Sequence, residues 1–456
     1  MLTTEDNELL TRVGAGTPMG ELLRQFWHPF MPSRDVEVDG PMKRVRLLGE
    51  DLVCFRDSNG DVGLVAENCP HRGASLFFGR NENAGLACNY HGWKFDTTGA
   101  CIDMPNEPAE SNFKDKVRAT AYPVRDVNHM LWAYMGPRET PPPFPAFEIN
   151  TLPEENVLPP HIMVEECNWV QGLEGDLDSS HVFFIHGRLR EEQVGPKGVM
   201  LGAWAHDLAP TLEVVPQPYG VVYSAKRQWK RDSSEVYHRI TQYIYPYFSM
   251  IAAGSQNSVS ARAWVPIDDE YHMLISMRGK LDGPVTEEER ARALDPFVLS
   301  GGYVEETPDP RTRYHTAANK TNDFLLDYEI QKTLNKSGIP FAGNLQDRAM
   351  TETMGPIYDR RKEHLGTSDR MIIMVRKQLM AAARQYMEDG SVPAVVDDER
   401  LYRVRSASII LPPGEDWKAH TDKARNADAG VPIAAVPLGG SDEFAPAIGK
   451  GVNPYA

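Results

Sequence analysis

Two Cys–His pairs stand in one short stretch of the chain, CPHRGASLFFGRNENAGLACNYHGWKFD (69–96), and constrain its fold more than any other feature. The pairs are Cys69-x-His71 and Cys88-x-x-His91. Two thiolates and two imidazoles suit a closed structural Zn(II) site or a [2Fe–2S] cluster with mixed ligation. Either metal centre requires the loops that carry the two pairs to face one site.

The sequence around these pairs has the alternation and turn signals of a small β domain. The runs RVRLL, LVCF and VGLVA, between residues 44 and 66, predict strands, and Asn59-Gly60 predicts a hairpin turn between the last two. FDTTGACI repeats this pattern around Gly99. We therefore expect an all-β domain of about a hundred residues, with the Cys–His pairs on two of its loops.

A second group of candidate ligands lies in GLEGDLDSSHVFFIHG (172–187), which we interpret as a helix. On a regular helix Asp178 and His181 share one face, because residues three apart are neighbours. His181 and His186 differ by about 140° around a helix of 3.6 residues per turn. They reach one metal only if the helix bulges or ends between them.

The two histidines alone would favour hydrogen-bonded core residues, because the residues between them are apolar. Together with the Cys–His pairs they favour a 2-His-1-carboxylate Fe(II) site, which leaves coordination positions open for O2. The stretch QDRAMTETMGPIYDR offers Asp347, Glu352 and Asp359 as the carboxylate, and the spacing does not choose among them.

The loops at the Cys–His pairs also carry Gly73 and Gly92. Such loops can direct backbone N–H groups at bridging sulfides, which a zinc ion does not need, so the pairs favour a [2Fe–2S] cluster. Two other classes of protein compete with this interpretation. A zinc-stabilised binding module would be colourless, and an electron carrier with only the cluster would leave residues 150–390 without a role.

Four stretches resemble the Rieske non-haem iron oxygenases, specifically the large subunit of the phthalate 4,5-dioxygenase-like group. They are MLTTEDNELLTRVGAGTPMGELLRQFW, the Cys–His stretch, NWVQGLEGDLDSSHVFFIH and QDRAMTETMGPIYDRRKEHLGTSD, and the resemblance covers nearly the whole chain. The resemblance implies an α+β fold. An all-β Rieske [2Fe–2S] domain would precede a helix-grip catalytic domain with an antiparallel sheet and flanking helices.

The resemblance also implies two metal centres. Cys69 and Cys88 would bind one iron of the cluster and His71 and His91 the other; His181, His186 and Asp347 would bind a mononuclear Fe(II). Asp178 matches the family's bridging carboxylate, which links a cluster histidine of one subunit to an iron histidine of the next. That role implies a head-to-tail homotrimer, or two stacked trimers in a hexamer.

The activity implied is hydroxylation of an aromatic carboxylate, phthalate- or benzoate-like, by reductive activation of O2. Electrons would come from NAD(P)H through a separate reductase that carries flavin and a plant-type iron–sulfur cluster. The alternative within this class is a monooxygenase that removes an O- or N-methyl group or cleaves an aryl ether.

Substrate contacts are expected from Ser179, within the iron helix, and from Arg239, in YHRITQYIYPYF. Arg239 could clamp a carboxylate, since a buried carboxylate needs cationic or hydroxyl partners. We favour the alternative, an exposed strand residue, because the sequence does not show which face of the strand Arg239 is on. Arg188 and Arg190 are weaker candidates. We interpret the cluster of Lys226, Arg227, Lys230 and Arg231 as a solvated face, with reductase docking as the alternative.

The chain divides into four parts by pattern. We predict an N-terminal helical segment at 1–40, the Rieske domain at 41–137, the catalytic domain at 138–395 and a C-terminal extension at 396–456. The Pro-rich run GPRETPPPFPAF links the two domains. A long helix is expected over RMIIMVRKQLMAAARQYMED, from 370 to a stop at Gly390. The C-terminal extension, rich in Pro, Ala and Gly, is expected to form an extended surface tail.

Composition limits the partners and the compartment. A net charge of −16 argues against nucleic acid, because phosphate binding needs a basic surface. The absence of an apolar run of about 18 residues or more predicts no membrane span. The acidic N-terminal sequence lacks a signal-peptide pattern, which predicts the cytoplasm. The five cysteines are few for so long a chain, and their odd number does not suit a disulfide framework. Cys54, Cys101 and Cys167 are therefore expected to be buried reduced thiols.

Overall fold

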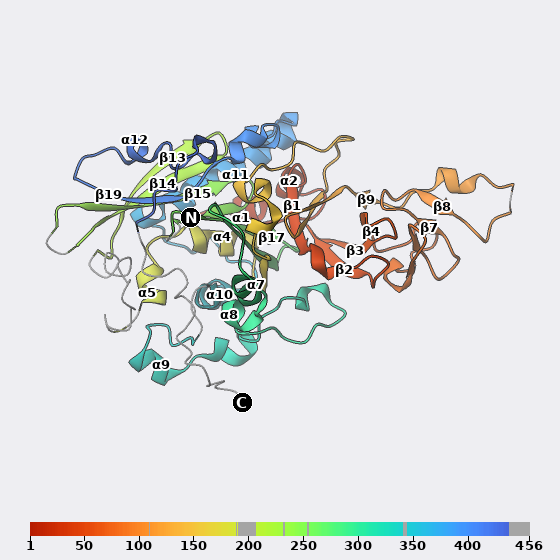
Figure 1. The fold of residues 1–456 in the computed structure, drawn as a ribbon, viewed down its shortest axis with the longest axis horizontal. Coiled ribbons are helices and arrows are strands. Elements are labelled where there is room, and N and C mark those ends of the chain that lie inside the picture. The colour runs from red at the N-terminus through yellow and green to blue at the C-terminus, as the bar shows by residue number, and fades with distance from the viewer. Residues whose placement is uncertain are drawn as a thin grey trace.

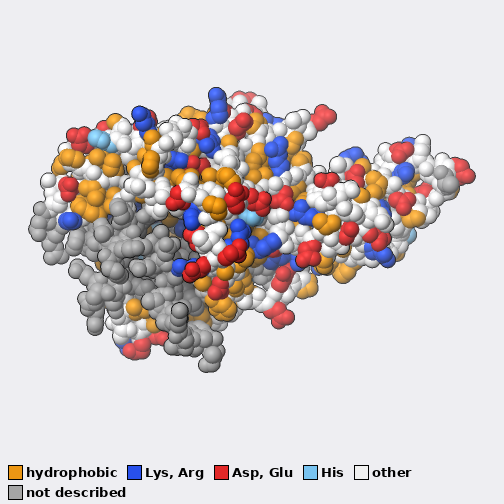
Figure 2. All heavy atoms as spheres, viewed as in Figure 1, with side chains coloured by type: hydrophobic (Ala, Val, Ile, Leu, Met, Phe, Trp, Pro, Cys, Tyr) orange, Lys and Arg blue, Asp and Glu red, His pale blue; other side chains and the backbone are white. Residues whose placement is uncertain are grey.

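The computed structural model describes residues 1–108, 110–187, 189, 207–230, 233–252, 255–340 and 344–436. These residues form two lobes, a small one that tapers away from a larger one (Figure 1). Charged side chains of both signs gather on the surface where the lobes join (Figure 2). The small lobe holds the Cys–His loops, and the larger lobe holds the histidines of the predicted iron helix.

The small lobe is built from two four-stranded antiparallel sheets, in the orders β2-β3-β4-β9 and β5-β6-β7-β8. Their bounds are β2 Lys43–Leu47, β3 Glu50–Arg56, β4 Val62–Ala66, β5 Arg80–Asn81, β6 Leu86–Ala87, β7 Lys94–Phe95, β8 Cys101–Asp103 and β9 Ala121–Tyr122. The predicted strands and both turns are confirmed. Gly60 and Gly99 have φ of 88° and 80°, a region that favours glycine.

An eight-stranded antiparallel sheet forms the centre of the larger lobe, in the order β12-β18-β17-β16-β15-β14-β13, with β19 also paired to β15. The strands are β12 His161–Glu165, β13 Thr211–Gln217, β14 Gly220–Gln228, β15 Val236–Ile244, β16 Phe248–Met250, β17 Ser258–Pro266, β18 His272–Lys280 and β19 Ala407–Leu411. Helices lie against this sheet (Figure 1). The described α-helices are α1 Thr4–Thr11, α2 Pro18–Leu23, α3 Glu148–Thr151, α4 Trp169–Leu177, α5 Val182–His186, α7 Glu287–Leu294, α8 Pro296–Ser300, α9 Tyr328–Thr333, α10 Asn344–Thr353, α11 Arg370–Asp389 and α12 Trp417–Thr421.

The long C-terminal helix confirms its prediction from start to stop. α11 begins at Arg370 and ends at Asp389, where Gly390 adopts a left-handed conformation with φ 76°. Its apolar face, which includes Val375 and Leu379, is buried in the main core. None of the described helices is both long enough and apolar enough to cross a lipid bilayer.

A three-stranded sheet, in the order β1-β11-β10, touches both lobes. Its strands are β1 Trp27–Pro32, β10 Val124–Val127 and β11 Met130–Tyr134. β10 contacts β4 of the small lobe, and β1 contacts β17 of the larger one. The N-terminal segment, predicted to be helical, therefore contributes the strand β1 as well as the short helices α1 and α2.

The C-terminal extension differs from the predicted surface tail. Residues 407–411 form β19, which pairs in register with β15 through Ile240 and Ala407. Trp417 of α12 is 1% exposed and packs with these strands. The apolar run ASIIL and the aromatic side chain bury more surface than a Pro/Gly-rich composition suggests. Residues 437–456 lie outside the described residues.

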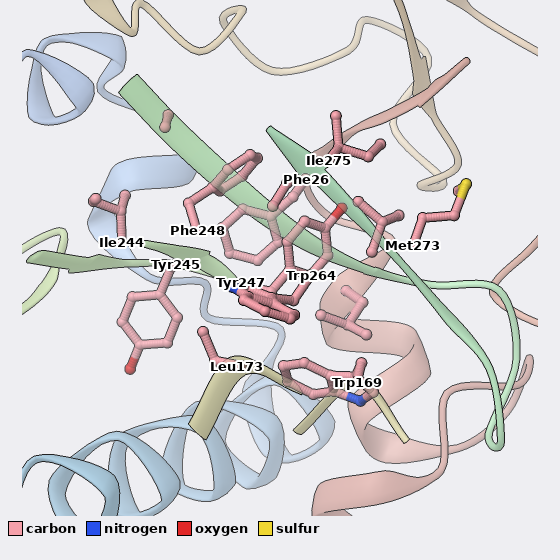
Figure 3. Packing of buried hydrophobic residues seen from close by; sticks show 14 of the residues in the cluster. Phe26, Trp169, Leu173, Ile244, Tyr245, Tyr247, Phe248, Trp264, Met273 and Ile275 are labelled. Carbon is pink, nitrogen blue, oxygen red and sulfur yellow. The ribbon is translucent and has the colours of Figure 1, made fainter. Parts of the chain in front are cut away.

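Helix α4 is fixed to the sheet by aromatic packing. Trp169 and Leu173 point from the helix into a cluster with Trp264 of β17 and with Tyr247, in the turn between β15 and β16 (Figure 3). Gly172 allows the close approach, since a Cβ there would lie 2.6 Å from Trp264 and 2.4 Å from a ring nitrogen of His272. This helix leads directly into the segment that carries the predicted iron ligands.

Candidate metal centres

The two Cys–His loops of the small lobe have the same backbone hydrogen bonds. In the first loop, Gly73 N–H donates to the carbonyl of Cys69 at 2.9 Å, and Cys69 N–H donates to that of Ala74 at 2.8 Å. In the second, Gly92 N–H donates to the carbonyl of Cys88, and Cys88 N–H to that of Trp93, both at 2.8 Å. The two turns are therefore local repeats of one geometry, in which Gly73 and Gly92 have φ of 75° and 81°.

These turns place the thiols inside and the imidazoles near the surface. Cys69 and Cys88 are 2% and 3% exposed, whereas His71 and His91 are half-buried. The two imidazole rings lie 4.5 Å apart between centroids, and His71 stacks on Trp93 at 4.2 Å. Burial raises the pKa of the Cys69 thiol to about 11, so a thiolate there needs a cationic partner at neutral pH.

In the larger lobe the helical segment is broken before His181. α4 ends at Leu177, and Asp178 is extended with φ −77° and ψ 124°. α5 then begins immediately after His181 and ends at His186. The predicted bulge or end between the two histidines is therefore wrong, because each histidine lies at one end of a single short helix.

The Asp178 carboxylate organises this break. One oxygen accepts from Ser180 N–H at 2.6 Å; the other accepts from His181 N–H at 3.2 Å and lies 3.3 Å from His181 Nδ1. Burial opposes its ionisation, but the hydrogen bonding and charge of His181 lower the pKa of Asp178. Asp178 thus holds both the backbone and the ring of His181 in the same chain.

Three candidate ligands of the larger lobe converge on one point. Asp347 Oδ1 lies 3.4 Å from His181 Nε2 and 3.0 Å from His186 Nε2. All three ligand atoms lie within 4.8 Å of one another. Burial opposes charge on both Asp347 and His186, but their mutual attraction lowers the pKa of Asp347 and raises that of His186. Two imidazoles and a carboxylate are the donor set of a mononuclear Fe(II) site, so the residues fit that metal.

Helix α10 carries Asp347 and is docked against α4. Gln171 of α4 donates to the carbonyls of Thr351 and Gly355, at 3.0 and 2.9 Å. The other two acidic candidates lie elsewhere. Glu352 forms an ion pair with Arg348, and Asp359 pairs with Arg361 at 2.7 Å.

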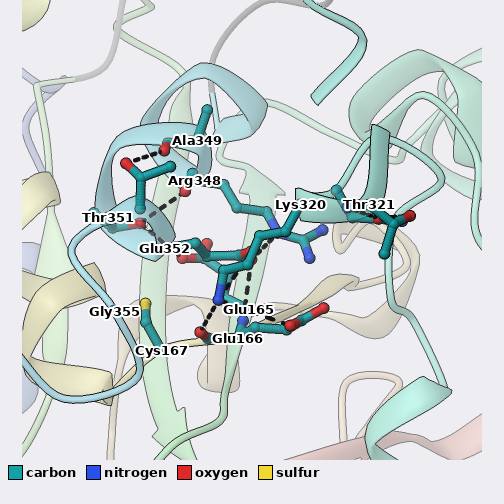
Figure 4. A network of polar contacts seen from close by, with 12 residues as sticks. Glu165, Glu166, Cys167, Lys320, Thr321, Arg348, Ala349, Thr351, Glu352 and Gly355 are labelled. Atoms are coloured by element: carbon teal, nitrogen blue, oxygen red, sulfur yellow. Dashed lines mark hydrogen bonds and ion pairs between the residues drawn. The ribbon is translucent and has the colours of Figure 1, made fainter. Parts of the chain in front are cut away.

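A buried polar network surrounds Arg348 and Glu352 of α10 (Figure 4). Arg348 is fully buried and donates to the Glu352 carboxylate, to Thr316 Oγ and to a ring nitrogen of His315. Glu352 also accepts from Glu166 N–H at 3.0 Å. Because a buried charge must be paired, this network resists rotation of the helix that carries Asp347.

A second group of potential ligands, Glu165, Cys167 and His272, lies beside this network. His272 Nδ1 meets the carbonyl of Cys167 at 2.8 Å, and its Nε2 lies 3.4 Å from the Glu165 carboxylate. All three are at most 2% exposed, and Gly172 packs on the imidazole ring. The predicted burial of Cys167 as a reduced thiol is confirmed, as it is for Cys54 and Cys101.

Of the predicted substrate residues, Ser179 follows Asp178 in the turn after α4, and Arg239 lies on β15 of the sheet. Arg239 is 6% exposed, so the favoured interpretation as an exposed strand residue is wrong. Ser179 is 1% exposed, and its Oγ and carbonyl accept from Arg227 at 3.1 and 2.6 Å. Tyr223, on the same face of the sheet as Arg239, donates to the carbonyl of Leu177 at 2.7 Å.

The predicted solvated face is also wrong at Arg227. Its side chain is 3% exposed, and burial together with the charge of Arg239 lowers its pKa to about 10. The strand GVVYSAKRQ carries a signal for the burial of Arg227. Every second residue of a strand lies on the same face, so Arg227 shares a face with Tyr223 and Ala225. Gln346 was missed as well, and no sequence signal distinguishes it. Arg188, Arg190 and Arg231 lie outside the described residues.

Two family models match the chain. The Rieske [2Fe-2S] domain model matches residues 26–123, and the "LigXa C-terminal domain like" model matches residues 133–435. The first contains the four predicted cluster ligands, and the second contains the three predicted iron ligands.

Curated relatives match over most of their length. The 3-chlorobenzoate-3,4-dioxygenase oxygenase subunit of Comamonas testosteroni is 37% identical, over 92% of this chain and 97% of the relative. The phthalate 4,5-dioxygenase oxygenase subunit of Pseudomonas putida is 37% identical, over 92% and 94%. The 5,5'-dehydrodivanillate O-demethylase oxygenase subunit of Sphingobium sp. is 32% identical, over 88% and 85%.

Solved structures share the fold at low identity. The terminal oxygenase of carbazole 1,9a-dioxygenase from Novosphingobium sp. KA1 superposes with a TM-score of 0.53 at 21% identity, over 84% of this chain and 99% of that one. Dicamba monooxygenase bound to 3,6-dichlorosalicylic acid gives a TM-score of 0.53 at 14% identity, over 80% and 99%. The predicted architecture, a Rieske β domain with an antiparallel α+β catalytic domain, is confirmed.

Proposed function

Because this chain belongs to the Rieske non-haem iron oxygenases, as the large subunit of an aromatic ring-hydroxylating system, we propose that it hydroxylates an aromatic carboxylate. Such systems use a Rieske [2Fe–2S] cluster, a mononuclear iron and a separate NAD(P)H-dependent reductase. The observation that carries the proposal is the convergence of His181, His186 and Asp347, whose ligand atoms lie within 4.8 Å of one another.

We assign each centre its residues from this chain. Cys69, His71, Cys88 and His91 would hold the cluster, and His181, His186 and Asp347 the mononuclear iron. When bound, the iron supplies O2 activation and the cluster supplies electrons. The chain's own contribution is to orient the ligands: Asp178 holds His181, and the Arg348–Glu352 pair holds the helix that carries Asp347.

Two buried arginines of the sheet, Arg227 and Arg239, support the substrate class. Arg227 and Arg239 lie on one face of neighbouring strands, since Arg239 pairs with Ala225 and Arg227 follows two residues later. Two positive charges in a buried region favour an anion, and a guanidinium suits a carboxylate geometrically. The 3-chlorobenzoate and phthalate dioxygenase relatives are named for aromatic carboxylates, which supports the same class. We therefore propose Arg239 as the carboxylate contact, with Ser179 oriented by Arg227.

Replacing Arg239 with Gln tests the carboxylate contact. A charge-assisted hydrogen bond contributes about 1.5–3 kcal/mol, so kcat/KM for the acid should fall about 10- to 100-fold. Activity toward an uncharged analogue, such as the corresponding amide, should change far less. Arg400→Gln, at a side chain that is 82% exposed, is the control. An equal loss on acid and amide would show that Arg239 does not recognise the carboxylate.

A second activity is favoured by one observation. The O-demethylase subunit from Sphingobium matches 88% of this chain, almost as much as the dioxygenase subunits do. The same ligand set could therefore serve O- or N-demethylation or aryl-ether cleavage of an aromatic acid. The pocket, rather than the metal ligands, would decide between the two reactions.

The deciding experiment is NADH-driven turnover with ¹⁸O2 and a flavin/iron–sulfur reductase. Benzoates, phthalates, phenoxybenzoates and methoxybenzoates form the substrate panel, and mass spectrometry reads the products. Two labelled oxygens in a carboxylated diol would establish dioxygenation. One labelled oxygen with loss of a fragment would establish the dealkylating reaction. Iron-loaded protein that oxidises no aromatic acid in the panel would contradict the proposed substrate class.

The assembly follows from the role of Asp178. We propose a cytoplasmic homotrimer, or a hexamer of two stacked trimers, in which Asp178 of one subunit meets a cluster histidine of the next. His71 and His91 are only half-buried, which leaves their rings accessible to a neighbouring subunit. Analytical ultracentrifugation of the metal-loaded protein would test this assembly, and a stable active monomer would contradict it.

A further inference from the structure

The two candidate iron histidines are oriented by chemically different groups. Their Nε2 atoms both face Asp347 Oδ1, and their Nδ1 atoms face away from it. His181 Nδ1 lies 3.3 Å from the Asp178 carboxylate. His186 Nδ1 lies 2.7 Å from Oε1 of Gln346, the residue that precedes Asp347 on α10. One imidazole therefore has an anionic partner and the other has a neutral amide.

Hydrogen-bond chemistry determines which way the Gln346 amide points. Its Nε2 donates to the carbonyl of Ile339 at 3.2 Å, and a carbonyl can only accept. The amide therefore presents its NH2 group to Ile339 and its oxygen to His186. An amide oxygen can only accept, so Nδ1 of His186 carries a proton, and Nε2 is the ring nitrogen left to bind a metal.

Burial keeps water away from the contact between Gln346 and His186. Gln346 is 2% exposed, so water does not replace either of its hydrogen bonds. Ile339 is itself buried, at 3% exposure, and packs with Phe324 and Ala349. The chain of contacts from Ile339 through Gln346 to His186 thus links the ring to a packed part of the larger lobe. The ring cannot turn without breaking a buried hydrogen bond.

We propose that Gln346 is a positioning residue that sets the tautomer and orientation of His186 for metal binding through Nε2. This inference rests on the proposed iron site. Gln346 and Asp347 are consecutive on α10, so one turn of helix supplies both a ligand and the partner that orients another ligand. The two imidazoles are then unequal donors, since a carboxylate partner increases ligand basicity more than a neutral amide does.

Two substitutions of similar length separate the roles of the amide oxygen and of the side-chain volume. Gln346→Met fills the space but offers His186 no oxygen acceptor. Gln346→Glu keeps an oxygen at the same reach. Gln331→Met, on an exposed part of α9, is the matched control. The measurements are Fe(II) affinity by competition with a chelator, and the EPR spectrum of the Fe(II) site after addition of nitric oxide.

Loss of a group that orients a ligand typically weakens metal binding about 10- to 100-fold. We expect Gln346→Met to show that loss together with an altered EPR spectrum, while Gln346→Glu retains iron and Gln331→Met matches the wild type. The visible spectrum of the cluster reports folding in every variant. Wild-type affinity and spectrum in Gln346→Met would overturn the proposal.

If Gln346→Met fails to fold, the EPR spectrum of Gln346→Glu still tests the proposal. A glutamate carboxylate makes His186 a stronger donor, so Gln346→Glu should shift the EPR spectrum of the nitric oxide complex. An unchanged spectrum in that variant would overturn the proposal. Failure of the iron site itself has a different signature, since the wild type would then bind no Fe(II) and give no nitric oxide signal.

Discussion

The two proposed metal centres are held in place by different kinds of interaction. Around the cluster ligands, two short turns repeat the same pair of backbone hydrogen bonds, and all four ligands come from one continuous stretch. Around the iron ligands, the contacts are between side chains on elements far apart in the sequence. His186 and Gln346 are 160 residues apart, and Gln171 and Thr351 are 180 residues apart.

This difference separates a local site from a tertiary one. A turn closed by its own backbone needs only the glycine positions and the adjacent sheet, so it forms wherever that stretch folds. The iron site needs α4, α5 and α10 to dock correctly, and buried charges such as Arg348 and Glu352 control that docking. We therefore expect the two centres to respond independently to substitution, with stability effects concentrated in the larger lobe.

The largest expected effect comes from removing a ligand at each centre. Asp347→Ala should abolish turnover and the nitric oxide EPR signal while leaving the visible spectrum of the cluster intact. Cys88→Ser should remove the cluster absorption while the Fe(II) site still binds nitric oxide. Metal analysis and both spectra on the same samples measure this. Loss of both centres from either substitution would contradict their independence.

The next largest effect is expected at Asp178, which belongs to the iron site but is proposed to couple the two centres. Asp178→Asn should retain both metals yet lower coupled turnover by at least about 100-fold, because the bridging charge is lost. Steady-state NADH oxidation with metal analysis measures this. Asp397→Asn, at a side chain that is 57% exposed, is the control. Full activity in Asp178→Asn would remove the bridging role.

The two Cys–His loops could be expected from the sequence because the four proposed cluster ligands and the two glycines stand in one short stretch. The sequence predicted His181 and His186 from their spacing, but placed the helix break wrongly. The break depends on how the Asp178 carboxylate caps His181. The spacing left three carboxylates open, and the family resemblance named Asp347. In the structure, docking of α10 against α4 brings Asp347 rather than Glu352 to the histidines. Gln346 and Arg227 were missed because their partners come from other elements.

A buried ion-pair network at Glu174 of α4 should give an intermediate effect on stability. Glu174 of α4 pairs with Arg376 at 2.5 Å and with Arg360 at 3.3 Å. Breaking such a pair from one side costs about 3–5 kcal/mol, so Glu174→Gln should lower the free energy of unfolding by this amount at pH 7. Chemical denaturation measures it. Glu329→Gln, in an exposed pair, should cost at most about 1 kcal/mol.

The ion pairs of Glu174 also make the stability of the fold depend on pH. Burial opposes ionisation of Glu174, but the two guanidinium groups outweigh it and lower its pKa. A carboxylate with a lowered pKa stabilises the fold above its unfolded pKa of about 4.3, and this contribution is lost as the pH falls through the folded pKa. The stability difference between wild type and Glu174→Gln should therefore shrink on acidification. A difference that stays constant down to acidic pH would contradict the assignment.

The smallest expected effect lies within the cluster loops and tests whether their equivalence extends beyond hydrogen bonds. Gly73 and Gly92 share a left-handed conformation, and a Cβ at Gly73 meets nothing within 4 Å. A Cβ at Gly92 would lie 2.5 Å from Pro105 Cγ. Gly73→Ala should cost about 1–2 kcal/mol from backbone strain alone, and Gly92→Ala should cost more. Thermal unfolding followed by cluster absorbance would compare the stabilities of the two variants. Equal losses of stability would contradict the added clash at Gly92.

The sequence alone determined the chemistry available to this protein: two Cys–His loops, a pair of histidines, and an α+β chain in two domains. These features depend on residue type and short spacing, which the backbone converts directly into turns, strands and helices. The tertiary structure decided which carboxylate joins the histidines, which amide orients His186, and that Arg227 and Arg239 are buried rather than solvated. Those outcomes depend on the docking of α4, α10 and the sheet. The free energy of that docking is a sum over many distant contacts, which no short stretch of sequence contains.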